Sequence, residues 1–168
     1  NGASVTAIDG GKVIDTSLGF SALVGLIMGT RCGDIDVSIV QYIMNKTGKS
    51  IDEVMDDLYK RSGLLGVSGV SSDSRDVEAA ALEGNKRAIL ANEMYAQKIA
   101  NYIAMYNNEL GGADVITLTA GVGENSKTMR KAILDKIASL GVKIDEEKND
   151  FRGEFRLIST DDSKIPVY

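Results

Sequence analysis

The sequence of 168 residues contains no histidine and no tryptophan, and it has only one cysteine and one proline. Without histidine the chain can build neither a histidine-based catalytic triad nor a Cys/His zinc site, so its chemistry must rely on Arg, Asp, Glu and backbone dipoles. Cys32 has no partner for a disulfide within the chain, which is typical of a reducing environment. We therefore expect a cytoplasmic protein.

The sequence also lacks a long apolar run and a basic patch. Its longest nearly apolar stretch, Gly19 to Gly29, falls far short of the roughly 20 residues of a membrane helix, and no signal-peptide pattern opens the chain. The net charge is −5, and no run of Lys or Arg is interleaved with aromatic residues. We expect neither a membrane nor a nucleic acid as a partner.

What is present is the composition of one globular domain, with 43% hydrophobic and 26% charged residues. No composition shift, linker or internal repeat marks a boundary within it. The chain begins at Asn1 without a methionine and ends at Tyr168, within a run that has the pattern of a strand. We expect it to be a piece of a longer protein.

The spacing of apolar residues predicts an α/β domain. Two β-branched runs flank Asp9-Gly10-Gly11 and predict a hairpin of residues 4–8 and 12–16. A capping box formed by Ser50 and Glu53 predicts the start of a helix that ends near Lys60. Further helices are predicted over residues 35–44, 76–82, 86–110 and 126–140, a loop over 64–73, and strands over 114–119, 155–160 and 165–168.

A glycine-containing segment, Gly121-Val122-Gly123-Glu124-Asn125, lies between a predicted strand and a predicted helix. Glycines at such a junction let backbone N–H groups approach an anion, and phosphate is the natural ligand. The segment has neither the Gly-Lys-Ser/Thr ending of a Walker loop nor the third glycine of the dinucleotide fingerprint. Because many strand-to-helix turns contain two glycines only to turn the chain, the pattern alone favours that structural interpretation.

Three other segments offer groups that suit phosphoryl chemistry. Arg31 stands between two glycines, where its planar fork could reach a phosphoryl group, or where it is a surface residue of a flexible loop. Asp73, Ser74 and Arg75 present an acid, a hydroxyl and a base, although Asp73 is equally explained as a helix N-cap. Asn1 and Gly2 offer small groups that a phosphate could approach, or that form a tight turn.

Taken together and in order, these segments resemble the acetate kinase (acetokinase) family of the acetate and sugar kinase and actin-like ATPase superfamily. The matching segments are Asn1-Gly2-Ala3-Ser4, residues 15–20 (DTSLGF), 28–36 (MGTRCGDID), 60–66 (KRSGLLG), 71–76 (SSDSRD) and 119–126 (TAGVGENS). The resemblance implies a ribonuclease-H-like α/β fold that is incomplete here. Residues 1–168 would be part of the C-terminal nucleotide-binding domain, without the N-terminal domain and the extreme C-terminus.

The resemblance also implies the reversible transfer of the γ-phosphoryl group of ATP to acetate, which gives acetyl phosphate and ADP in the presence of Mg²⁺, in a homodimer. By similarity, Arg31 stabilises the transition state. Nucleotide-binding residues would be Asn1 and Gly2 of a phosphate loop, Asp73, Ser74 and Arg75 near adenosine, and Gly121, Val122, Gly123, Glu124 and Asn125 of a second loop. No metal ligand is assigned. Because positioning for transfer needs both walls of a cleft, we expect the chain alone to be inactive.

One departure from the family bears on the substrate. Ala22 stands where the family usually has a proline that lines the acyl pocket, and a roomier pocket would accept propionate, since one methylene is worth only about 1 to 3 kcal/mol of discrimination. One alternative is therefore a kinase for propionate or another short carboxylate. A second alternative, of a different class, is a non-catalytic nucleotide-binding or dimerisation fragment.

Overall fold

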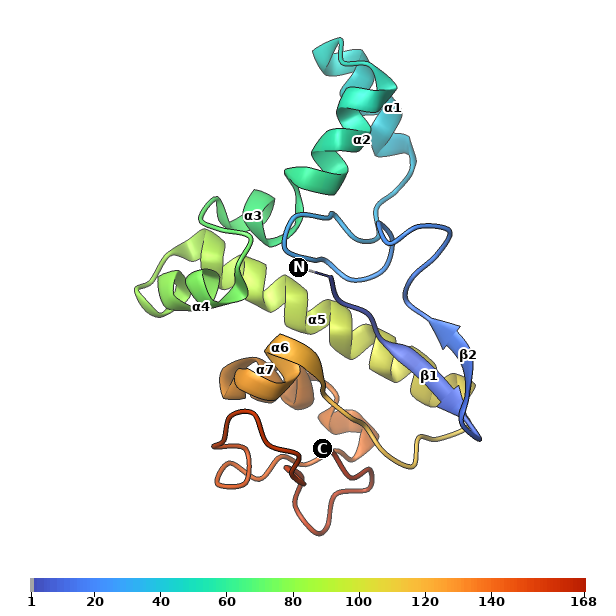
Figure 1. The fold of residues 1–168 in the computed structure, drawn as a ribbon, viewed down its shortest axis with the longest axis vertical. Coiled ribbons are helices and arrows are strands. Elements are labelled where there is room, and N and C mark those ends of the chain that lie inside the picture. Colours follow the sequence, from blue (N-terminus) through green and yellow to red (C-terminus); the bar gives the residue numbers. More distant parts are fainter. Residues whose placement is uncertain (1) are drawn as a thin grey trace. The chain divides into compact units, whose positions relative to one another are not determined.

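The computed structural model describes residues 2–168 and has a mixed α/β architecture (Figure 1). The chain packs into two compact units. The first contains the chain up to Val5 together with Thr16–Tyr95, and the second contains Thr6–Asp15 and Ala96–Tyr168. The long helix α5 (Lys86–Glu109) passes from the first unit into the second.

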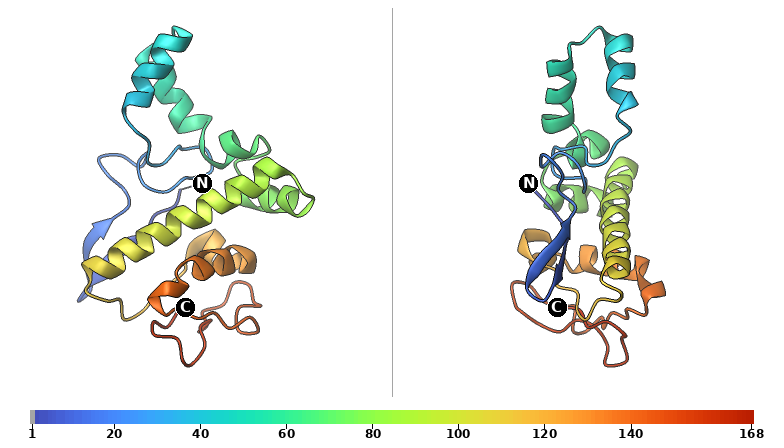
Figure 2. Two further views of the ribbon diagram at one scale, coloured as in Figure 1. Left: turned by 180° about the vertical axis from the view of Figure 1, so that it is seen from behind. Right: turned by 90° about the vertical axis from the view of Figure 1, so that its right-hand side faces the viewer.

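The first unit is helical and is connected by irregular segments. It contains α1 (Ser38–Thr47), α2 (Ile51–Lys60), α3 (Gly63–Ser68), α4 (Ser74–Leu82) and the beginning of α5. Helices α1 and α2 form a helical hairpin, visible in the right-hand view of Figure 2. The capping box predicted at the start of α2 is confirmed, because the Ser50 N–H donates to the Glu53 carboxylate and the Glu53 N–H donates to the Ser50 hydroxyl.

The helices of this unit differ in part from the sequence prediction. Helix α1 begins at Ser38 rather than at residue 35, because the Asp36 carboxylate accepts the Ser38 N–H at 2.8 Å and holds a turn before the helix. The loop predicted over residues 64–73 is wrong in its first part, where α3 forms. Arg87 stabilises the end of α3 by donating to the carbonyls of Val67 and Gly66, both at 2.7 Å.

The second unit contains the predicted hairpin as β1 (Thr6–Asp9) and β2 (Lys12–Thr16), the end of α5, and α6 (Ala120–Asn125), α7 (Lys127–Lys136) and the 3-10 helix η1 (Ala138–Leu140). The three strands predicted in its C-terminal part form isolated bridges only. One bridge is parallel, between Ile116 and Val167, and the other is antiparallel, between Ile144 and Ser159. Backbone hydrogen bonds continue beside the bridges, because the Leu118 N–H donates to the Tyr168 carbonyl and the Ile158 N–H donates to the Val167 carbonyl, but no regular strand is assigned there.

The buried side chains of each unit include the predicted apolar face of α5, whereas α1 has no buried residue and its Ile39 is 42% exposed. Along α5, Ala91 and Tyr95 are buried in the first unit, and Ile99, Ile103 and Tyr106 are buried in the second, at the three- and four-residue spacing of one helix face. Around α7 the buried side chains are those of Met129, Ile133, Leu134, Ile137, Ile158 and Val167. None of the helices within residues 2–168 is both long and apolar enough to cross a membrane.

Candidate functional site

Arg31 lies in a turn of the first unit whose backbone is fixed on both sides. The Thr30 carbonyl accepts the N–H of Ser62 at 2.9 Å, and the N–H of Cys32 donates to the Leu58 carbonyl at 3.0 Å. Leu58 belongs to α2 and Ser62 precedes α3, so both helices hold the turn. This geometry favours a fixed residue over the flexible-loop interpretation of Arg31.

Gly63 packs directly against the turn that carries Arg31. Its φ angle is +64°, and a Cβ atom at this position would lie 2.1 Å from the Met28 carbonyl oxygen and 2.8 Å from the Arg31 carbonyl oxygen. Any side chain would therefore both adopt a left-handed conformation and push the turn away. The glycine at this position is required by the close approach of two backbones.

The guanidinium of Arg31 contacts neutral groups. Its Nη1 donates to the Ala22 carbonyl and lies against the Met28 sulfur, each at 3.4 Å, and it forms none of the ion pairs found within residues 2–168. A Cβ atom at Gly2 would lie 3.8 Å from the same Nη1. The structure thus brings together two predicted site residues, Gly2 and Arg31, and leaves the cation without a carboxylate; Asn1 lies outside the described residues.

Asp73 and Arg75 form a second cluster in the first unit. The Asp73 carboxylate accepts the Arg75 backbone N–H at 2.9 Å and the Arg75 side chain through Nε at 3.0 Å and Nη2 at 2.5 Å. The Arg75 side chain, and then its backbone N–H, lowers the pKa of Asp73 to about 2. Asp73 is therefore the N-cap of α4 and also holds Arg75, whose side chain is 79% exposed. Ser74 is the first residue of the helix.

The segment Gly121–Asn125 is helical, which corrects the prediction of a loop. It forms most of α6, and the next helix, α7, begins at Lys127 with Ser126 as its N-cap. Side chains of the segment stabilise the short helix, because Glu124 accepts the Ala120 N–H and Asn125 donates to the Gly121 carbonyl, both at 2.9 Å. Ala120 is left with a φ of +60° at the junction, where backbone strain is often linked to function.

The two glycines of α6 have different surroundings. A Cβ atom at Gly123 would lie 2.6 Å from the Leu118 carbonyl carbon, so this residue must be glycine for the helix to pack on the preceding segment. A Cβ atom at Gly121 would meet nothing within 4 Å. Packing therefore explains why residue 123 is glycine but not why residue 121 is. Gly121 leaves the backbone of α6 uncovered on its exposed side.

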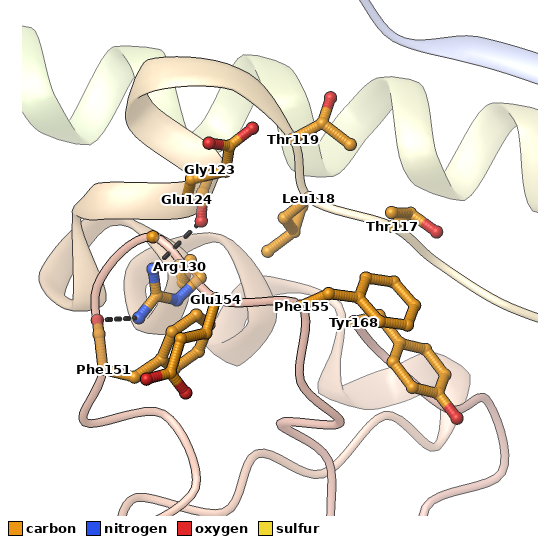
Figure 3. Close-up of a pocket in the computed structure, with 11 residues that line it drawn as sticks. Thr117, Leu118, Thr119, Gly123, Glu124, Arg130, Phe151, Glu154, Phe155 and Tyr168 are labelled. Atoms are coloured by element: carbon orange, nitrogen blue, oxygen red, sulfur yellow. Dashed lines mark hydrogen bonds between the residues drawn. The ribbon is translucent and has the colours of Figure 1, made fainter.

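Next to Gly123 the second unit contains a pocket of about 200 Å³, shown in Figure 3. Its wall includes Arg130, a residue that the sequence analysis did not single out. Arg130 is 1% exposed and donates to the Gly123 carbonyl at 3.0 Å. A sequence signal existed, because Arg130 shares the buried stripe of α7 with Ile133 and Leu134 at a spacing of three and four residues. The pocket is lined by Thr117, Leu118, Thr119, Gly123, Glu124, Arg130, Phe151, Gly153, Glu154, Phe155 and Tyr168.

The described residues offer no protein-only metal cage, since no group of three or more Cys, Asp or Glu side chains within residues 2–168 could hold a metal ion. Mg²⁺ commonly keeps several waters and binds through one or two carboxylates and the phosphates of a substrate.

The whole chain, residues 1–168, matches the model of the acetokinase family. It is 55% identical over 166 residues to the acetate kinase of Limosilactobacillus fermentum, covering 99% of this chain and 42% of that protein. It is 49% identical over 168 residues to the acetate kinase of Methanosarcina thermophila, covering 100% of this chain and 41% of that protein. The chain thus spans about two fifths of the length of these relatives.

Solved structures match the fold over the same extent. The crystal structure of Porphyromonas gingivalis acetate kinase has a TM-score of 0.95 and 42% identity, covering 99% of this chain and 42% of that one. The crystal structure of a propionate kinase from Francisella tularensis has a TM-score of 0.93 and 41% identity, covering 100% of this chain and 43% of that one. The predicted fold class is confirmed: the mixed α/β fold is that of the short-chain carboxylate kinases. The chain belongs to the acetokinase family.

Proposed function

We propose that the protein containing this chain transfers the γ-phosphoryl group of ATP reversibly to acetate, giving acetyl phosphate and ADP. The observation that carries the proposal is the geometry around Arg31. Its backbone is fixed by two helices, and its guanidinium lies next to Gly2. Within residues 2–168 the guanidinium donates only to a carbonyl and a thioether. A fixed arginine without a carboxylate partner is suited to stabilising the negative charge of a transferring phosphoryl group.

Each unit, taken by itself, offers candidate residues for binding the nucleotide. In the first, Gly2 and the fragment Asp73, Ser74 and Arg75 are the candidates, with the mostly exposed guanidinium of Arg75 oriented by Asp73. In the second, the open side of Gly121 offers backbone without a side chain in the way. Bound ATP would supply the phosphoryl group together with Mg²⁺, and this chain would bind, orient and neutralise charge.

Ala22 bears on which carboxylate is used. Its carbonyl accepts from Arg31 at 3.4 Å, so the position where the family usually has proline lies beside the proposed transition-state residue. A propionate kinase among the structural neighbours supports the same alternative. We therefore propose acetate as substrate and propionate as the second candidate, to be separated by comparing kcat/KM for the two acids in the full-length gene product.

The homodimer expected from the resemblance is part of this proposal. Apolar side chains of α5 that are exposed in the chain, including Leu90 at 51% and Met105 at 43%, support an interface along this helix. Sedimentation equilibrium of the full-length gene product is expected to give twice the monomer mass. A monomer at micromolar concentration would contradict this part of the proposal.

A pair of glycine variants tests nucleotide binding by α6. Gly121→Ala places its Cβ in open space, so the melting temperature should not fall while the KM for ATP rises, because the added methyl group meets only the ligand. Gly123→Ala is the matched comparison, since its Cβ would overlap the Leu118 carbonyl carbon and lower the melting temperature itself. Unchanged ATP kinetics in a folded Gly121→Ala variant would exclude α6 from the nucleotide site.

A further inference from the structure

Arg130 is a completely buried cation on α7. Its guanidinium makes four hydrogen bonds, and all four go to amide oxygens. Nε donates to the Asn149 side-chain oxygen at 2.7 Å and Nη1 donates to the Gly123 carbonyl at 3.0 Å. Nη2 donates to the carbonyls of Asn149 at 2.7 Å and Phe151 at 3.1 Å.

The charge of Arg130 is not balanced by an acid. It takes part in none of the ion pairs within residues 2–168, and its other neighbour is the Phe151 ring, whose centroid lies 4.2 Å from Cζ. Burial lowers the pKa of Arg130, which remains protonated because an arginine starts from so high a value. Burying an unpaired charge is costly. If this position only filled the core, an apolar side chain would make the fold more stable.

The bonds of Arg130 join two segments that are far apart in the sequence. One is α6, reached through Gly123, and the other is the turn at residues 149–151. Two residues beyond this turn, the Gly153 N–H donates to the Glu124 carbonyl of α6 at 3.0 Å. Figure 3 shows the guanidinium between the Gly123 carbonyl and the Phe151 backbone, at the wall of the pocket.

The acceptors are arranged in a way that only a planar fork can satisfy. The three nitrogen atoms of the guanidinium donate to three kinds of acceptor. These are the Gly123 carbonyl of α6, the side-chain oxygen of Asn149 and the backbone carbonyls of the turn at residues 149–151. A lysine ammonium is a point charge on a flexible stem and cannot bond to all of them while its side chain covers the Phe151 ring. A lysine at this position would keep the charge and lose the bridge.

We propose that Arg130 is a positioning residue that holds the glycine segment α6 in the shape needed to receive the nucleotide. The effect on catalysis rests on the proposed function. The hydrogen bond that fixes α6 is a property of this chain alone. Arg130 acts through Gly123 and, being buried, does not itself touch the nucleotide.

The test compares Arg130→Lys with Phe151→Leu and with Lys131→Gln in the full-length gene product. Arg130→Lys removes the bridge, and Phe151→Leu keeps the four hydrogen bonds of Arg130 but removes the ring that stacks with Arg130 and with Arg156. Lys131→Gln is the control, because Lys131 is the next residue of the same helix and its ion pairs with Asp135 and Glu146 are on the surface. Each variant is measured by its KM for ATP and acetate, its melting temperature, and hydrogen exchange of the amides of residues 121–126.

For Arg130→Lys we expect the KM for ATP to rise about tenfold or more, the size expected for one charge-assisted hydrogen bond, with the KM for acetate unchanged. The amides of residues 121–126 should exchange faster than they do in the wild type, while the exchange of the α5 amides should be unchanged. Phe151→Leu should show the same pattern with a change of about threefold. Lys131→Gln should leave both Michaelis constants and the local exchange unchanged.

The proposal is overturned if the exchange of residues 121–126 is unchanged in folded Arg130→Lys and Phe151→Leu while only the melting temperature falls, because that is the result of a purely structural role. If Arg130→Lys does not fold, Phe151→Leu decides between the same two results. If the wild type shows no ATP-dependent phosphorylation, the proposed function fails, and the exchange measurement still decides whether Arg130 holds α6.

Discussion

The most informative perturbation of the Arg31 turn is Gly63→Ala, because the chain contains a matched control. Gly63 has a φ of +64°, and its Cβ would overlap the Met28 and Arg31 carbonyl oxygens at 2.1 and 2.8 Å. Gly48, the C-cap of α1, has a φ of +73°, and nothing lies within 4 Å of its Cβ. The two glycines therefore share a conformation and differ in the space beside them.

The magnitudes follow from this difference. A left-handed alanine costs roughly 1 to 2 kcal/mol, and the smaller freedom of alanine in the unfolded chain returns about 0.4 to 1 kcal/mol, so Gly48→Ala should lower the free energy of unfolding by about 1 kcal/mol. Gly63→Ala carries the same conformational cost, and the overlap with two carbonyls adds about 1 to 3 kcal/mol as an overpacking cost. We therefore expect a loss of about 2 to 4 kcal/mol for Gly63→Ala.

Urea denaturation followed by circular dichroism measures both losses in the same protein. With an m-value of about 2 kcal/mol/M, the midpoint should fall by about 0.5 M for Gly48→Ala and by about 1 to 2 M for Gly63→Ala. In native conditions Gly63→Ala should also lower kcat, since the turn that carries Arg31 must move. Equal midpoints for the two variants would refute the argument that close backbone approach, rather than φ alone, requires glycine at position 63.

Three further predictions use the other site residues. Ala120→Gly should raise the free energy of unfolding by about 0.5 to 1 kcal/mol in a denaturant titration, because relief of the left-handed alanine outweighs the entropy of glycine; a loss of stability would contradict the strain at this residue. Because the folded pKa of Asp73 is lowered to about 2, its contribution to stability should be complete above its ordinary value of 3.8 and be lost as the pH falls toward 2. In a pH titration by NMR, a midpoint near 4 for the Asp73 carboxyl would show that Arg75 does not hold it. Arg31→Ala should lower kcat far more than the affinity for ATP, and equal losses in steady-state kinetics would indicate a binding role only.

The sequence by itself determined the elements whose signals are local. The Ser50 and Glu53 capping box and the apolar spacing of Val54 and Leu58 were sufficient to predict α2, since its cap and its buried face lie within ten residues. The same holds for the long helix α5 and for the hairpin at Asp9-Gly10-Gly11. The motifs that carry the family resemblance are also local, and the family is confirmed.

The tertiary structure alone decided the features that depend on contacts between distant residues. Helix α3 ends at carbonyls that Arg87 satisfies from about twenty residues further along the chain, which no local pattern encodes. The strands predicted near Ile116 and Val167 have the right composition, but strand pairing depends on a partner about fifty residues away. Here it forms an isolated bridge with a few adjoining backbone hydrogen bonds and no regular strand. The spacing of Arg130 from Ile133 and Leu134 could have indicated that it is buried, but not which groups it contacts. Its buried hydrogen bonds form because the fold brings α6, which precedes Arg130 in the sequence, and the turn at residues 149–151, which follows it, into contact with the guanidinium.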